Sequence, residues 1–336
     1  MNQQFNLKGY DMAQAERLSA WQALQQRTKH GDAVFWVLTL FFALLVIALV
    51  FAVGYVVWIG SSEARARFGF SFLFQSGWDP NAGNFGALPA IYGTVVSSGI
   101  ALLLAGPLGI MIGVFLSELC PDKLRSPLSF LIELLAAIPS VIYGMWGVFV
   151  FVPFFRSVVA SPLSKSIGKS VPLFAGPVAA GRGLLVAGII LAIMILPTVA
   201  AITRDVLNAV PNHQREAMLA VGATRWEMIR KAVLPYSRAG IIGGLMLGLG
   251  RALGETMAAL MVIGSVKNTI SPSLFGGGIT AASLIASELP NANDSLHEST
   301  LILVALVLFG ITLAVNLVAR LVIWRSARGP VGSMRA

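Results

Sequence analysis

The sequence predicts an all-α integral membrane protein with six transmembrane helices. Of its 336 residues, 56% are hydrophobic and only 12% are charged. A soluble domain carries about a quarter charged residues, so this chain has too few to cover a soluble fold, and it is too apolar to be disordered. One cysteine excludes an internal disulfide, and three scattered histidines with that cysteine leave no zinc-ligand spacing.

Six stretches are long enough to cross a bilayer, which takes about 20 mostly apolar residues. The first, 33–62, is uncharged, begins after 32 residues and is too long for the apolar region of a signal peptide, so we expect a membrane helix there. Residues 1–32 are expected to form a cytoplasmic amphipathic segment, with a partly ordered tail as the alternative. The other five helices are expected at 86–117, 128–155, 183–203, 239–264 and 299–324.

The positions of the basic residues predict the orientation. Most of the 24 Lys and Arg residues fall on the side of these spans that holds both termini. Cytoplasmic segments carry such an excess, so both termini are expected to be cytoplasmic, the second within a tail at 326–336. This bias explains the net charge of +9, and no nucleic-acid partner is predicted.

Two glycine patterns and the histidines are assigned structural roles. Gly168-Lys169-Ser170 resembles the end of a phosphate-binding loop, but Leu163 stands where a glycine is needed. The chain is therefore not expected to hydrolyse ATP. Glycines at four-residue spacing in the fifth span are expected to let another helix approach closely. His30, His213 and His297 are expected to be ordinary surface residues.

The connection 204–238 between the fourth and fifth spans carries the first functional motif. It contains Glu216-Ala217-Met218, then Gly222, then after nine residues Ala232-Val233-Leu234-Pro235. The pattern resembles the EAA loop of bacterial ABC importer permeases, departing from it at Met218 and Ala232, where the residues remain apolar. In that family the loop docks on an ATPase subunit.

The residues themselves give the same loop a physical reading. We expect a short helix from Glu216, a sharp exit at Gly222, and a second helix whose apolar side is formed by Trp226, Ile229 and Val233. Pro235 is then expected to turn the chain into the fifth span. A surface helix–turn–helix of this kind suits a groove on a partner; a purely structural amphipathic loop is the alternative.

A second feature lies inside the fifth span. Arg251 is expected near the middle of the bilayer, where an arginine costs about 2.5–3.5 kcal/mol on insertion scales. Glu255 is four residues on, so the two are expected to pair on one helix face. A planar guanidinium suits phosphate because it can make two parallel hydrogen bonds. From chemistry alone, an anion path and a structural ion pair between helices remain equal alternatives.

Two membrane segments extend the resemblance. Leu247–Ala258 looks like the fifth-helix signature of phosphate ABC transporter permeases, and Glu133–Gly147 looks like their third-helix signature. The resemblance implies the type I importer transmembrane fold over a core at 86–325, in the bacterial inner membrane. It implies two sets of site residues. The expected substrate path comprises Arg251, Glu255, Ser140 and Tyr143, and the expected ATPase-coupling loop comprises Glu216, Ala217, Gly222, Leu234 and Pro235.

The resemblance also implies partners. These are a second related permease subunit, two ATPase subunits that hold the ATP and Mg, and a soluble phosphate-binding protein; no cofactor is expected on this chain. One alternative is an ABC importer for phosphonate, sulfate or molybdate. A secondary transporter is another, although it would be expected to show internal repeats and an intramembrane ion site. A membrane enzyme is disfavoured because no catalytic constellation is present in the sequence.

Overall fold

The computed structural model describes residues 32–166, 168, 170–175 and 181–327, so the expected segments 1–32 and 326–336 lie almost wholly outside the described residues. The chain divides into two compact units, Met1–Val56 and Val57–Ala336. The described part of the first unit is helical: α3 spans Asp32–Gly60 and crosses the boundary.

Six described helical segments are long and apolar enough to cross a membrane, which confirms the expected number of spans. The long helices of the second unit are α5 (Leu88–Val114), α10 (Leu184–Asn208), α13 (Leu234–Leu253) and α16 (Ser295–Ala327). The shorter helices are α4 (Ser62–Phe68), α6 (Asp122–Ala137), α7 (Ser140–Trp146), α8 (Val152–Phe155), α9 (Ser161–Ser166), α11 (Asn212–Ala220), α12 (Arg225–Met228), α14 (Met257–Val262) and α15 (Ala281–Glu288). Two-residue strands β1 (Trp78–Asp79) and β2 (Asn84–Phe85) form an antiparallel hairpin.

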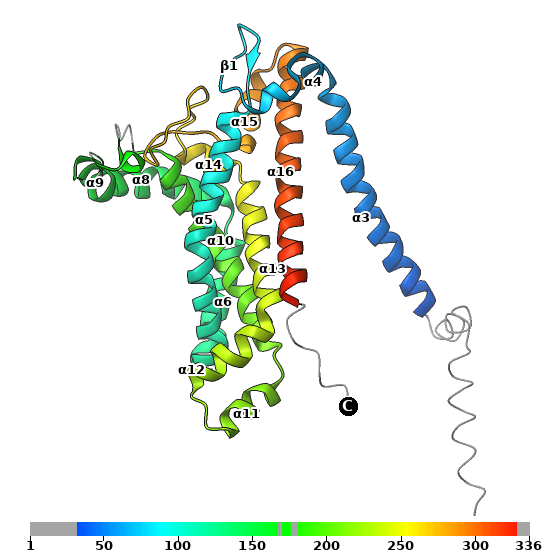
Figure 1. Ribbon diagram of the computed structural model, residues 1–336, viewed down its shortest axis with the longest axis vertical. Helices are drawn as coiled ribbons and strands as arrows, with labels where there is room; N and C mark the ends of the chain where they lie inside the picture. The colour runs from blue at the N-terminus through cyan, green and yellow to red at the C-terminus, as the bar shows by residue number, and fades with distance from the viewer. Residues whose placement is uncertain (1–31, 167, 169, 176–180, 328–336) are drawn as a thin grey trace, which may run out of the picture. The chain divides into compact units, whose positions relative to one another are not determined.

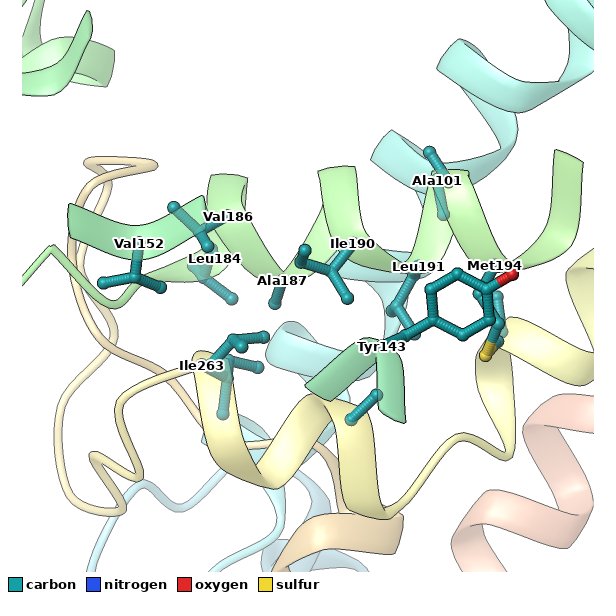
Figure 2. Close-up of a cluster of buried hydrophobic side chains, with 14 of the residues drawn as sticks. Ala101, Tyr143, Val152, Leu184, Val186, Ala187, Ile190, Leu191, Met194 and Ile263 are labelled. Carbon is teal, nitrogen blue, oxygen red and sulfur yellow. The ribbon is translucent and has the colours of Figure 1, made fainter. Parts of the chain in front are cut away.

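Helix α10 is the centre of the second unit. It packs against α5, α13, α6 and α14, and residues such as Leu184, Ile190 and Met194 are fully buried. Figure 2 shows these side chains directed toward Tyr143 of α7 and Ile263 after α14. A membrane helix buried on several sides is held by packing with neighbouring helices and has little contact with lipid.

Glycines permit this close packing. A Cβ added at Gly113 of α5 would lie 2.6 Å from Cβ of Thr203 on α10, and one at Gly244 of α13 would lie 2.8 Å from Cγ2 of Ile202. Gly248 faces Val199 in the same way, at 2.9 Å. The expected close helix approach is therefore confirmed at Gly240, Gly244 and Gly248, where α10 is the helix that approaches, but it is wrong at Gly250, where an added Cβ would meet nothing within 4 Å.

The expected third span, 128–155, is wrong as a single helix. Helix α6 ends at Ala137, and α7 begins at Ser140. Ile138 is extended, with ψ 129°, because the ring of Pro139 disfavours the helical conformation of the residue before it. The membrane-spanning segment is Ser140–Ser166, with π turns at Gly147–Phe151 and Arg156–Ala160.

The expected fifth span, 239–264, also differs from the structure. A continuous helical segment runs from Arg225 to Leu253, and a separate helix, α14, follows a break at Gly254–Thr256. Pro235 lies in the first turn of α13 and does not end the helix. A π turn at Ile229–Val233 directly precedes it, and such a turn relieves the clash between a proline ring and the preceding helical turn.

Different elements form the two ends of the second unit. Helices α11 and α12 lie at one end, and α4, β1 and α15 lie at the other (Figure 1). At the α15 end, Glu288 accepts hydrogen bonds from Lys267 and from the indole of Trp78, and His297 stacks on Phe85. The expectation that His297 is a surface residue is wrong, since it is 5% exposed.

Glu288 remains ionised in this cluster. Burial alone would raise the pKa of its carboxyl, but the hydrogen bonds from Lys267 and Trp78 and the positive charge of Lys267 outweigh burial and lower the pKa below its usual range. The cluster connects the β1–β2 hairpin, the segment before α15 and the start of α16, so it fixes the shape of this end of the unit.

Substitution of adjacent glycines tests the packing of α13. Gly244→Ala should lower the free energy of unfolding by about 1–3 kcal/mol, because the added methyl group overlaps Ile202. Gly243→Ala should leave it unchanged or raise it by up to about 1 kcal/mol, because nothing lies within 4 Å of the added atom and alanine favours helix. Thermal unfolding in detergent measures both; equal effects would contradict the packing described.

Candidate functional site

Arg251 lies at the edge of the α13 face that packs against α10, and its guanidinium reaches Thr198 of α10. A cleft of about 640 Å³ opens beside it, lined by Thr198 of α10, Asn316 of α16 and one face of α13; the α13 residues are Gly243, Met246, Leu247, Gly250 and Arg251. A Cβ at Gly243 or Gly250 would meet nothing within 4 Å. We call this space the Arg251 cleft. The glycines of α13 thus lie on two faces of the helix: Gly244 and Gly248 pack against α10, and Gly243 and Gly250 border the open cleft.

The guanidinium of Arg251 is largely free to bind a ligand. Its Nη1 donates to Oγ1 of Thr198 at 3.3 Å. Among the described residues no carboxylate forms an ion pair with Arg251. A guanidinium has five N–H donors, so most of them remain available. Asn316 adds an exposed amide to the same cleft, with Nδ2 donating to the carbonyl of Thr312 at 2.9 Å.

The expected pairing of Glu255 with Arg251 is wrong. Glu255 lies in the break after α13, where the chain has left the helix, so the four-residue spacing does not place both on one helix face. Its Oε1 accepts a hydrogen bond from the backbone N–H of Ala258 at 3.1 Å, in the first turn of α14. Glu255 is 9% exposed, and it stabilises the start of α14 by satisfying a free backbone donor.

The two residues expected from the third-helix segment lie apart from the cleft lining. Tyr143 is buried, and its hydroxyl donates to the carbonyl of Leu135 at 2.8 Å, which connects α7 to α6 across the break at Pro139. Ser140 is half-buried at the first position of α7. Neither is among the residues that line the Arg251 cleft.

The two signature segments nevertheless contact each other. A Cβ at Gly144 of α7 would lie 3.0 Å from Cα of Ala258, the last residue of the fifth-helix segment, and one at Gly147 would lie 3.0 Å from Cγ1 of Val262, further along α14. Helix α7 therefore packs directly on α14, the short helix that follows Arg251. Residues far apart in the sequence are brought together, and the Pro139 break and the Gly254 break adjoin the same packed region.

The coupling loop, residues 204–238, has the expected helix–turn–helix form. Helix α11 carries Glu216 and Ala217 on its exposed side. Gly222 has φ +81° with nothing within 4 Å of an added Cβ, so the chain turns there in a conformation that glycine tolerates best. Thr224 and Glu227 then form a capping box that starts α12.

Apolar side chains are exposed at the tip of this loop. Val221 is 79% exposed and Trp226 62%, and Leu219 is also exposed. Of the three residues expected to form the apolar side of the second helix, Trp226 is exposed, whereas Ile229 and Val233 are buried against the rest of the unit. Leu234 and Pro235 continue into α13 and anchor the loop to the membrane helix. Exposed large apolar groups together at one end of a molecule indicate a protein partner.

Three polar residues of these sites are not apparent from the sequence. Thr198 follows Pro197 in an apolar span without any motif, and only the fold brings it to Arg251. Asn316 is an isolated amide in the last span. Polar residues within membrane spans are rare and often functional, so its position alone could have indicated a site residue. Arg215 precedes the Glu216 motif and is bound by Glu118, almost one hundred residues earlier in the chain.

Comparisons with known proteins agree with this architecture. Residues 105–326 match the family model of the binding-protein-dependent transport system inner membrane component. The chain belongs to this family. With its six apolar helices, it is a multi-pass protein of the bacterial inner membrane and a subunit of a transport system.

Curated relatives and solved structures show which transport proteins this chain is similar to. The phosphate transport system permease protein PstC of Mesorhizobium japonicum is 47% identical over 311 residues, which are 91% of this chain and 94% of that protein. The protein of the same name from Haemophilus influenzae is 45% identical over 294 residues, 87% of this chain and 93% of that one. The MetNI methionine ABC transporter, in an inward-facing conformation, matches with a TM-score of 0.52 at 19% identity over 71% of this chain and 95% of that one, which shows the fold alone.

Two substitutions of Glu255 distinguish a helix-capping role from an ion pair. Glu255→Ala should lower the free energy of unfolding by about 1 kcal/mol, because Ala258 loses its acceptor. Glu255→Gln should cost much less, because the amide oxygen still accepts that hydrogen bond. Thermal unfolding of the purified protein measures the difference. Equal losses of unfolding free energy in the two variants would contradict the capping role and support an ion pair between Glu255 and Arg251.

Proposed function

We propose that this chain is the permease subunit of an ATP-driven importer that takes up inorganic phosphate and that it forms half of the translocation path. The observation that carries the proposal is the Arg251 cleft. There a guanidinium without an ion-pair partner among the described residues meets a hydroxyl and an amide from two other helices. Family membership and the names of the relatives support phosphate as the substrate.

The chemistry of the cleft suits a tetrahedral oxyanion. Arg251 offers paired N–H donors to two phosphate oxygens. The hydroxyl of Thr198 can donate to the anion or accept from a protonated phosphate oxygen, and the Asn316 amide can do either as well. The open face at Gly243 and Gly250 leaves room for the anion beside the helix backbone. Because the cleft offers phosphate a single charged group and is open, we expect it to bind phosphate weakly and to release it readily. Tyr143 and Glu255 support this site by holding α7 and α14, and Ser140 stays a candidate for the substrate path at the start of α7.

The other half of the path comes from partners. A second, related permease subunit completes the cleft, and a soluble phosphate-binding protein delivers the anion at the end that carries α15. Two ATPase subunits bind ATP and Mg, and one of them docks on the coupling loop of this chain through Glu216, Ala217 and the exposed Leu219, Val221 and Trp226. Both termini lie on the ATPase side. This chain holds no ATP and binds no nucleic acid.

Uptake by the whole reconstituted complex tests the proposal. Vesicles that contain both permeases, the ATPase and the binding protein should take up labelled phosphate only when ATP is supplied. Arsenate should compete, and sulfate and phosphonate should not. ATP-driven uptake of a different oxyanion would contradict the substrate, and uptake on an ion gradient without ATP would contradict the mechanism.

Substitution of Arg251 tests its role in phosphate uptake most directly. Arg251→Ala should leave assembly intact and reduce phosphate uptake at least about tenfold, because an anion loses a charge-assisted pair of hydrogen bonds worth about 1.5–3 kcal/mol each. Arg320→Ala is the control, since Arg320 is exposed on α16 and lies outside both the cleft lining and the coupling loop. Initial uptake rates, normalised to assembled complex, measure both. Normal uptake by Arg251→Ala would remove this residue from the path.

Gly222 tests the coupling loop through backbone conformation. Gly222→Val should weaken recovery of the ATPase with the permease, because valine is strained at φ +81° although the site has space. Gly222→Asn should recover most of the ATPase, because asparagine tolerates that conformation. Co-purification from membranes gives the comparison, and full recovery with the valine variant would count against docking at this turn.

A further inference from the structure

Arg215 of α11 has every hydrogen-bond donor occupied. Its Nε and Nη2 donate to the two carboxylate oxygens of Glu118 at 3.2 and 2.8 Å. Nη2 also donates to the carbonyl of Leu207 at 2.8 Å, and Nη1 donates to the carbonyl of Val210 at 2.5 Å and to Oδ1 of Asn212 at 3.3 Å. These account for all five N–H groups of a guanidinium. Unlike Arg251, Arg215 has no free donor for a ligand, so its role lies in the contacts it makes.

Those contacts join three elements. Glu118 lies in the π turn Phe115–Leu119 that extends α5. Leu207 is in the last turn of α10, and Val210 follows its end. Arg215 itself is on α11, next to the exposed Glu216. A cation at the carbonyl end of a helix is favourable, so the guanidinium binds the end of α10 and the end of α5 at once. We call this arrangement the Arg215–Glu118 clamp.

The clamp is buried and further secured. The side chain of Glu118 is 5% exposed and that of Arg215 17%. The hydroxyl of Ser117 lies 3.0 Å from two acceptors, Oε1 of Glu118 and Oδ1 of Asn208, and its one hydrogen can be donated to either of them. Opening such a pair would leave a charge in a poorly solvated site, which is strongly unfavourable. By contrast, the pair Lys231–Glu227 on the same loop is exposed, with 63% and 42% of the two side chains accessible.

We propose that Arg215 is a positioning residue that transmits motion of the coupling loop to the substrate path. The clamp makes α11 move as one body with the neighbouring ends of α5 and α10. Helix α10 carries Thr198, which is hydrogen-bonded to Arg251, so displacement of α11 reaches the Arg251 cleft through one rigid, centrally packed helix. The inference rests on the proposed function, because it requires an ATPase that moves the loop.

The ratio of phosphate taken up to ATP hydrolysed tests the clamp. In vesicles that hold the whole complex, Arg215→Ala should lower this ratio roughly tenfold, within the range of coupling between distant sites, while basal ATP hydrolysis per complex continues. Asp122→Ala removes the exposed ion pair Arg125–Asp122, which lies outside the coupling loop, and should leave the ratio unchanged. A loss of stability alone would reduce the amount of complex and would not change this ratio.

Two milder variants keep the test decisive where Arg215→Ala fails to assemble. Glu118→Gln keeps the volume of the side chain and removes its charge, and Arg215→Lys keeps the charge and loses the fork; both should lower the ratio. An unchanged ratio in the variants that assemble would overturn the proposal, as would the failure of all three to assemble, since the clamp would then be a requirement for folding. A wild-type complex without ATP-driven uptake would refute the proposed function itself.

Discussion

The close packing of α10 against α5 and α13 is the constraint on which the rest of the structure depends. Small residues make it possible: Gly109 and Gly113 on α5, and Gly244 and Gly248 on α13, bring backbones within contact of Val199, Ile202 and Thr203. In a bilayer, helix association relies on such van der Waals contact, because lipid is as apolar as the side chains it replaces. With one face of α13 closed by α10, the open face at Gly243 and Gly250 is left to line the Arg251 cleft, and Thr198 of α10 holds the Arg251 guanidinium at the edge of that cleft.

Two helix breaks shape the surroundings of that cleft. Pro139 separates α6 from α7, and the residues after Leu253 separate α13 from α14. Each break frees backbone groups that must be satisfied inside the protein. The hydroxyl of Tyr143 accounts for one carbonyl before the first break, and the carboxylate of Glu255 accounts for one N–H after the second. Tyr143 and Glu255 therefore stabilise the helices around the site, and Arg251 is the group with N–H donors free to bind a ligand.

Much of this could be predicted from the sequence, and the limits have physical causes. Charge-free runs such as 33–62 locate spans because the bilayer requires about 20 apolar residues, and the glycine spacing in α13 correctly indicates a close helix contact. Run length does not reveal where a helix breaks within an apolar stretch, so the third and fifth spans were misplaced and Glu255 was paired with the wrong partner. Thr198, Asn316 and the bond between Arg215 and Glu118 depend on contacts between distant helices, which no local pattern reports.

The central claim is that the open face of α13 lines the phosphate path and its other face does not. Cysteine accessibility in the assembled complex tests this directly, after the natural Cys120 is replaced by serine. A thiol placed by Gly250→Cys should react with a small water-soluble reagent and be protected by phosphate, because that position opens into the cleft. A thiol placed by Gly248→Cys faces Val199 and should not react. Equal reactivity at the two positions, or no protection by phosphate at Gly250→Cys, would contradict the account.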